Sequence, residues 1–165
     1  MSEIKNGIVI NTSPWIALSI CGKTELLKQL YEEIYMPIGV KEEILIGGEE
    51  KVGVTELGKS SWLKVEEVSD IEKPKLLYEL DRGEAEVIIL AKEKEIREVL
   101  IDEKVARMQA KILGLEVVGT LGLLLRAKKK GVLSEIKPLI EKMLQRGIWI
   151  RSKIVKGMLK EAGEG

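Results

Sequence analysis

Short apolar runs rich in β-branched residues alternate along this chain with segments whose apolar residues recur at helical spacing. Such alternation is typical of a parallel sheet with helices on both faces, because parallel strands need long crossover connections that are usually helical. We therefore predict an α/β fold with a central parallel sheet. The apolar runs are residues 7–10, 34–36, 98–101 and 115–118, and the main helical patterns are residues 23–33, 84–94, 104–113 and 121–130.

The last third of the chain has a different pattern. Two helical segments lie between Ser134 and Glu161, separated by residues 147–150, and no further strand of standard length is evident. About thirty residues bury too little surface to fold alone. We therefore predict a main domain over residues 1–133 and a helical C-terminal extension, residues 134–165, packed on it.

The amino-acid composition excludes several chemistries. The chain has no histidine, so a Ser-His-Asp or Cys-His nucleophile and a histidine-ligated zinc are impossible. The single cysteine, Cys21, cannot form an intrachain disulfide. The first residues lack the basic and apolar parts of a secretory signal, and every apolar run is shorter than the ~20 residues of a membrane span. We expect a cytoplasmic protein that does not cross a membrane.

A formal net charge of zero conceals a strong asymmetry between the two halves of the chain. Residues 1–103 hold 13 Lys and Arg against 22 Asp and Glu, whereas residues 104–165 hold 14 against 5. The basic half could hold phosphates and the acidic half cations. Alternatively, the two halves neutralise each other.

Several polar side chains occupy positions where parallel α/β sheets bind ligands, beyond the carboxyl ends of the strands. Asn11 and Asp102 end predicted strands, and Glu103 follows Asp102. Glu84 leads the apolar face of a helix that should be buried, and Glu43 lies near the start of a short helix. Carboxylates that meet at one sheet edge repel each other, and a divalent cation relieves that repulsion.

Each of these residues also has a purely structural interpretation. Asp81 and Glu84 have the spacing of a capping box, which would satisfy the start of a helix. Asp102 could cap the next helix, and Asn11 could bond its own backbone in a turn. Glu43 could belong to a solvated face.

Five segments of the chain, in order, carry a combination of motifs. They are residues 8–14 (Ile-Val-Ile-Asn-Thr-Ser-Pro), Met36-Pro37 through Glu43-Ile44, residues 82–86 (Arg-Gly-Glu-Ala-Glu), residues 100–107 (Leu-Ile-Asp-Glu-Lys-Val-Ala-Arg) and residues 119–122 (Gly-Thr-Leu-Gly). Together these segments resemble PIN-domain proteins, in particular the prokaryotic branch akin to VapC-type toxins. The similarity runs from about Gly7 to Leu133, and that branch often carries a helical tail like residues 134–161.

This resemblance implies a three-layer α/β/α sandwich and a metal-dependent ribonuclease, whose acidic cluster binds Mg²⁺ or Mn²⁺ and activates water against RNA. It also implies a toxin of a toxin-antitoxin pair, with a cognate antitoxin as partner, and a homodimer. On that template the catalytic set is Asn11, Glu43, Glu84, Asp102 and Glu103, of which the four acids are metal ligands, with Glu86 a weaker candidate, while Thr12, Ser13 and Thr120 orient the metal or its water.

One position departs from the family pattern. The family has aspartate where this chain has Asn11. An amide offers a carbonyl oxygen to a cation but no negative charge. The sequence therefore supports two hypotheses, an active ribonuclease and a catalytically degenerate PIN domain that binds RNA or protein.

A third interpretation, a phospho-accepting receiver-like domain, fits the sequence less well. Such a domain would need a carboxylate in place of Asn11 and a lysine near Gly119-Thr120.

Basic residues in the second half are candidates for RNA binding. Arg107, Arg126 and Lys128 could hold the RNA backbone, although Lys128 also suits a solvated helix end. Nothing basic interleaves with Trp15 and Trp149, so we predict core or subunit-interface roles for them rather than base stacking.

Overall fold

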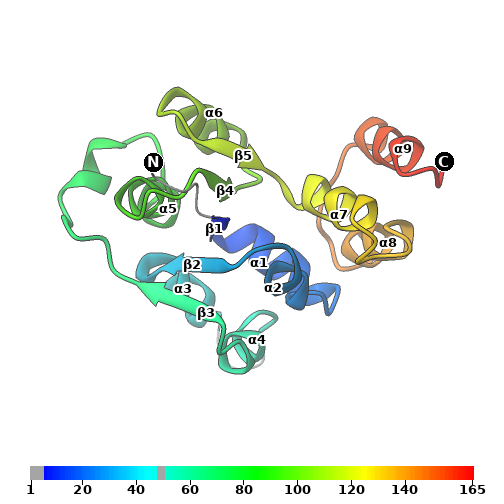
Figure 1. The fold of residues 1–165 in the computed structure, drawn as a ribbon, viewed down its shortest axis with the longest axis horizontal. Helices are drawn as coiled ribbons and strands as arrows, with labels where there is room; N and C mark the ends of the chain where they lie inside the picture. The colour runs from blue at the N-terminus through cyan, green and yellow to red at the C-terminus, as the bar shows by residue number, and fades with distance from the viewer. Residues whose placement is uncertain (1–5, 48–50) are drawn as a thin grey trace.

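The computed structural model of the protein describes residues 6–47 and 51–165, and over these residues it contains a sheet of five parallel strands (Figure 1). All four neighbouring pairs are parallel, in the order β3-β2-β1-β4-β5. The predicted α/β fold, a three-layer α/β/α sandwich, is confirmed. The strands are β1 (Gly7–Ile10), β2 (Glu33–Pro37), β3 (Leu63–Glu66), β4 (Glu98–Leu100) and β5 (Glu116–Val118).

Helices connect the strands and cover the sheet. Helix α5 packs on β1, β2 and β4, with α3 and α6 beside it, while α1 contacts α7 and α8. None of the described helices has the length and apolarity that a membrane span needs. The helices are α1 (Thr12–Ile20), α2 (Glu25–Leu30), α3 (Ile38–Ile46), α4 (Val54–Lys59), the 3-10 turn η1 (Lys73–Leu76), α5 (Arg82–Glu93), α6 (Lys104–Ile112), α7 (Thr120–Lys129), α8 (Lys137–Gln145) and α9 (Ser152–Glu161).

The core lies between the sheet and its helices. All four residues of β1 are buried, as expected of a central parallel strand covered on both faces. Trp15 is also fully buried, and its Nε1 donates to the carbonyl of Gly53 at 3.0 Å, which confirms a core role for this tryptophan. Residues 1–5, which bear on the expected absence of a signal, lie outside the described residues.

Two elements differ from what the sequence predicts. The helix expected over residues 23–33 is confined to Glu25–Leu30, because Glu33 already pairs with Gly7 as part of β2. Strand pairing at the buried sheet thus overrides the helical pattern. Residues Trp62-Leu63-Lys64-Val65, where the sequence indicates only a minor strand, overlap with β3, an edge strand paired with β2.

The C-terminal helices α7, α8 and α9 lie together at one end of the molecule (Figure 1). Glu164 fastens this end, because its carboxylate accepts hydrogen bonds from Lys128 Nζ at 2.9 Å and from the backbone amides of Ile136 and Lys137 at 2.9 and 3.0 Å. Burial alone would raise the pKa of Glu164, but these hydrogen bonds and the Lys128 charge lower it to about 2. The division at residue 133 stays a prediction.

Strand order reverses direction at the centre of the sheet. The chain moves outward from β1 to β2 and β3, then returns to the other side of β1 for β4 and β5. In open parallel sheets, ligands bind beyond the carboxyl ends of the strands at such a switch point. Asn11 directly follows β1, and Asp102 lies two residues beyond β4, so both flank this position.

Candidate functional site

Asp102 is held by the start of α7. The backbone amide of Thr120 donates to Asp102 Oδ1 at 2.7 Å, and the Thr120 hydroxyl donates to Oδ2 at 2.5 Å. The amino-terminal end of a helix favours negative charge. Thr120 is buried and Asp102 is exposed, so a buried residue orients a carboxylate that faces solvent at the sheet edge.

Glu43 is tied to the start of α1. The Thr12 hydroxyl donates to Glu43 Oε2 at 2.7 Å, which connects residues 31 positions apart. A Cβ atom on Gly83 would lie 3.1 Å from the same Glu43 oxygen, so the carboxylate also lies against the first turn of α5. The structure therefore brings Thr12 and Glu43 together, beside the helix that begins with Arg82.

Glu84 combines a structural role with an acidic neighbourhood. It forms the predicted capping box, because Glu84 Oε1 accepts from the Asp81 amide at 3.1 Å and Asp81 Oδ1 accepts from the Glu84 amide at 2.8 Å. Burial raises the pKa of Glu84, as do the charges of Asp81, Glu103 and Glu43, against the lowering effect of the Asp81 hydrogen bond. Acids in α3 and at the starts of α5 and α6 thus act on the Glu84 carboxylate.

Glu103, rather than Asp102, caps helix α6. Glu103 Oε2 accepts from the Ala106 amide at 2.8 Å. The interpretation of Asp102 as the cap of this helix is therefore wrong, and Asp102 is left to pair with Thr120. Two consecutive acids have separate partners on separate helices.

Asn11 carries an unusual polar atom. The side chain is buried, and its Oδ1 has no hydrogen-bond partner among the described residues, although Asn11 precedes α1. Its backbone amide donates to the carbonyl of Leu100 at 3.1 Å, which places Asn11 beside the end of β4. Buried oxygens without a donor are rare in native proteins and mark places where a ligand, ion or water can bind.

Arg107 brings positive charge to the same edge. Its Nη1 donates to the carbonyl of Ile101 at 2.8 Å. A Cβ atom on Gly119 would lie 2.8 Å from Arg107 Nη1 and 3.0 Å from Asp102 Oδ1. Because Gly119 has no side chain, the Arg107 guanidinium and the Asp102 carboxylate can both lie close to its Cα atom.

A family model described as a PIN domain matches residues 7–164 of the chain. The chain belongs to the PIN-domain family. PIN domains are generally nucleases, so the fold is of a nuclease type. No curated protein matches the sequence. The match spans α8 and α9 as well as the sheet, so it covers both predicted parts of this PIN domain.

PIN-domain nucleases typically use divalent metals. The candidate residues at this edge of the sheet offer oxygen ligands, which Mg²⁺ and Mn²⁺ prefer. Within residues 6–47 and 51–165, no group of three or more Asp, Glu, Cys or His side chains is placed to hold a metal. In this part of the chain Glu84 and Glu103 bond amides at helix starts, and Glu43 bonds Thr12.

Two oxygen atoms at this edge nevertheless have the chemistry of Mg²⁺ ligands. Mg²⁺ usually keeps several waters and takes one or two carboxylates together with substrate phosphates, rather than a complete protein cage. Asp102 supplies an oriented carboxylate, and the partnerless Asn11 Oδ1 is a carbonyl oxygen of the type that hard cations accept.

Two of the predicted RNA-binding residues lie elsewhere in the PIN domain. Arg126 donates to the hydroxyl of Tyr31 and to Glu98 Oε1, the latter at 2.6 Å, and Glu98 begins β4, at the opposite edge of the sheet. Lys128 donates to the carbonyl of Ala162 at 2.6 Å and to Glu164. Arg126 and Lys128 are thus both bonded to groups of the same chain other than the candidate site residues.

The Glu86 carboxylate has a structural role, because it bonds groups on two helices. Its Oε1 accepts from the Gly39 amide at 2.9 Å, in the first turn of α3, and its Oε2 accepts from Arg82 Nε at 2.7 Å. The carboxylate thus joins α3 to α5, in agreement with its weaker standing as a site candidate.

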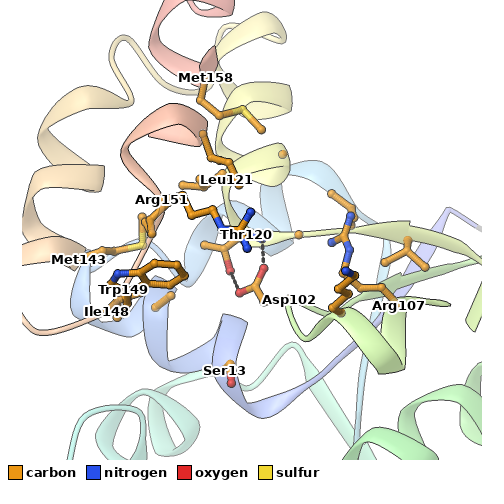
Figure 2. A pocket seen from close by; sticks show the side chains of 18 of the residues that line it. Ser13, Asp102, Arg107, Thr120, Leu121, Met143, Ile148, Trp149, Arg151 and Met158 are labelled. Atoms are coloured by element: carbon orange, nitrogen blue, oxygen red, sulfur yellow. Dashed lines mark hydrogen bonds between the residues drawn. The ribbon is translucent and has the colours of Figure 1, made fainter. Parts of the chain in front are cut away.

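A cavity of about 880 Å³ opens beside the Asp102–Thr120 pair. Ser13, exposed at the start of α1, lines it together with Arg107 (Figure 2). The opposite wall comes from the loop before α9 and includes Trp149 and Arg151. Trp149 is 79% exposed, so it is not a core residue. Sequence reasoning missed this wall, because the pattern around Trp149 predicts a core or subunit-interface role for it.

Proposed function

We propose that this PIN domain is a Mg²⁺- or Mn²⁺-dependent ribonuclease that hydrolyses RNA phosphodiester bonds. The observation that supports the proposal is the position of Asp102, oriented through both oxygens by Thr120 at the point where strand order reverses. Glu43 and Glu103 lie close enough to Glu84 for their charges to raise its pKa. Acids that repel one another at a switch point fit a site for a cation and a phosphate.

Asp102 and Asn11 would hold the metal, which, when bound, lowers the pKa of a coordinated water and neutralises charge on the phosphate. Thr120 keeps the Asp102 carboxylate in one orientation through its amide and hydroxyl. Glu84 is buried beside other acids, and a nearby cation would favour its ionised form. Arg107 would contact a phosphate oxygen with the donors that Ile101 leaves free.

The alternative is a degenerate PIN domain that binds RNA or protein without cutting it. Asn11 favours this alternative, because the amide adds no charge to the metal site. Cleavage of a labelled single-stranded RNA, with Mg²⁺ or Mn²⁺ and with chelator, separates the two when Asn11→Asp and Asp102→Asn are run beside the native chain. Metal-dependent cutting by the native chain supports the ribonuclease, whereas cutting by Asn11→Asp alone supports the binding module.

We also propose that the chain is a toxin-like member that forms a homodimer and is masked by an antitoxin. An exposed apolar stripe on α6 supports a protein contact, since Val105, Met108 and Ile112 are 41%, 55% and 73% exposed. Light scattering on the purified chain tests the dimer. A strict monomer at high concentration contradicts it.

A further inference from the structure

The cavity beside Asp102 has two walls of different chemistry. One wall carries the polar edge of the sheet, including Asp102, Thr120 and Arg107. The other is mainly apolar, apart from Arg151, and comes from the C-terminal helices and the loop between them, including Met143, Ile148 and Met158 (Figure 2). Its volume of about 880 Å³ falls within the range of cavities that hold small organic ligands.

Trp149 is the aromatic residue of this cavity. Its indole lines the space from the loop before α9, on the side opposite Arg107 (Figure 2). The side chain is 79% exposed, whereas Trp15 is fully buried. A large aromatic surface left in water beside a candidate phosphate site is suited to stack on a flat ring.

Charge at the cavity is predominantly positive. Lys104, Arg107 and Arg151 line it, against the single carboxylate of Asp102. Three cations against one carboxylate leave the lining of the cavity with an excess of positive charge. Cations that surround an exposed aromatic form the pattern by which proteins bind single-stranded nucleic acid: bases stack, and phosphates meet lysine and arginine.

We propose that this cavity binds an unpaired nucleobase of single-stranded RNA, stacked on Trp149, with the adjoining phosphates held by Lys104 and Arg151. The inference rests on the proposed function, because it places the base next to the phosphate that Asp102 faces. Charge complementarity favours a polyanion over an apolar peptide as the occupant. The helical extension thereby supplies substrate contacts in addition to packing.

The test is equilibrium binding of a fluorescein-labelled single-stranded RNA of about 12 nucleotides, measured by anisotropy in chelator so that cleavage is not required. Trp149→Ala should weaken binding about 10-fold, and Trp149→Phe should restore most of it, because every aromatic ring offers a stacking face. Tyr78→Ala is the matched control, since Tyr78 is 86% exposed but does not line this cavity. Its affinity should equal that of the native chain.

A second probe with the same sugar-phosphate backbone but no bases isolates the stacking contact. Native and Trp149→Ala chains should bind this abasic probe equally. Equal affinity of native and Trp149→Ala chains for the normal RNA, or no RNA binding at all, overturns the proposal. Metal-dependent cleavage with no effect of Trp149→Ala would overturn the base site and leave the ribonuclease intact. Trp149-dependent binding without cleavage in any metal would support the base site and contradict the ribonuclease.

Discussion

The Thr120 side chain and amide together occupy both oxygens of Asp102, at 2.5 and 2.7 Å. This pair joins the end of β4 to the start of α7 and fixes the carboxylate that the proposed chemistry needs most. Charge-assisted hydrogen bonds of this length are strong and directional. The geometry of the site therefore depends on a residue that need not touch the substrate.

Thr120→Val should lower RNA cleavage by about 10-fold while the fold is retained, because valine preserves shape and the backbone amide but removes the hydroxyl donor. Thr120→Ser should restore activity. The measurement is kcat and KM for a labelled RNA, with the loss expected in kcat. Equal activity of Thr120→Val and the native chain would show that the hydroxyl does not position Asp102.

Gly119→Ala should damage the site without unfolding the protein. The added methyl would lie 2.8 Å from Arg107 Nη1 and 3.0 Å from Asp102 Oδ1, so both side chains must move. Gly58→Ala is the control, because a Cβ atom there meets nothing within 4 Å. We expect near-native melting temperatures for both variants and a loss of cleavage for Gly119→Ala only. Full activity of Gly119→Ala would contradict the crowded geometry.

Glu84→Gln should make the protein more stable at pH 7 than the native chain. Burial and neighbouring acids raise the pKa of Glu84 above its usual 4.5, so folding favours the protonated form. The corresponding stability is present below pH 4.5 and is lost as the pH rises through the folded-state pKa. Glutamine keeps the capping bond to Asp81 without the charge. Urea unfolding at pH 4 and pH 7 checks this, and an advantage of glutamine that does not grow with pH refutes it.

Glu164→Gln should have the opposite pH dependence. The folded-state pKa of Glu164 is about 2, below its usual 4.5, so its stabilising effect is present above pH 4.5 and is lost as the pH falls toward 2. We expect Glu164→Gln to lower the free energy of unfolding by about 2 kcal/mol at pH 7 and to match the native chain near pH 2. Glu161→Gln is the control, since Glu161 and its partner Lys129 are both more than half exposed. A pH-independent difference would exclude the ionised carboxylate as the cause.

Local patterns in the sequence predicted most of the fold and part of the site. Apolar runs located β1, β2, β4 and β5, and the strand ends located Asn11 and Asp102 at the edge where the order reverses. The capping box at Glu84 was also visible, because its partner lies three residues away. Contacts within a few residues leave a local signal, and strand ends of a parallel sheet share an edge.

Long-range partners were not predictable in the same way. Arg126 is held by Tyr31, 95 residues away, and Glu98, 28 residues away, so helical position alone could not place it at the far edge of the sheet. No basic residue interleaves with Trp149 in the sequence, so the sequence predicts a core or subunit-interface role for it. Its exposure results from the way residues 148–151 pass over the cavity, which depends on packing of α8 and α9.

The most direct measurement is the rate of Mn²⁺-dependent cleavage of a labelled single-stranded RNA by the native chain and by Asp102→Asn, purified side by side. Asp70→Asn is the control, because Asp70 is exposed and its carboxylate accepts from the nearby Glu72 amide, away from Asp102 in the sequence. We predict cleavage by the native chain and by Asp70→Asn that chelator abolishes, and a fall of about 100-fold or more for Asp102→Asn. Equal rates for the native chain and Asp102→Asn, or cleavage that survives chelator, would contradict a metal-dependent ribonuclease centred on Asp102.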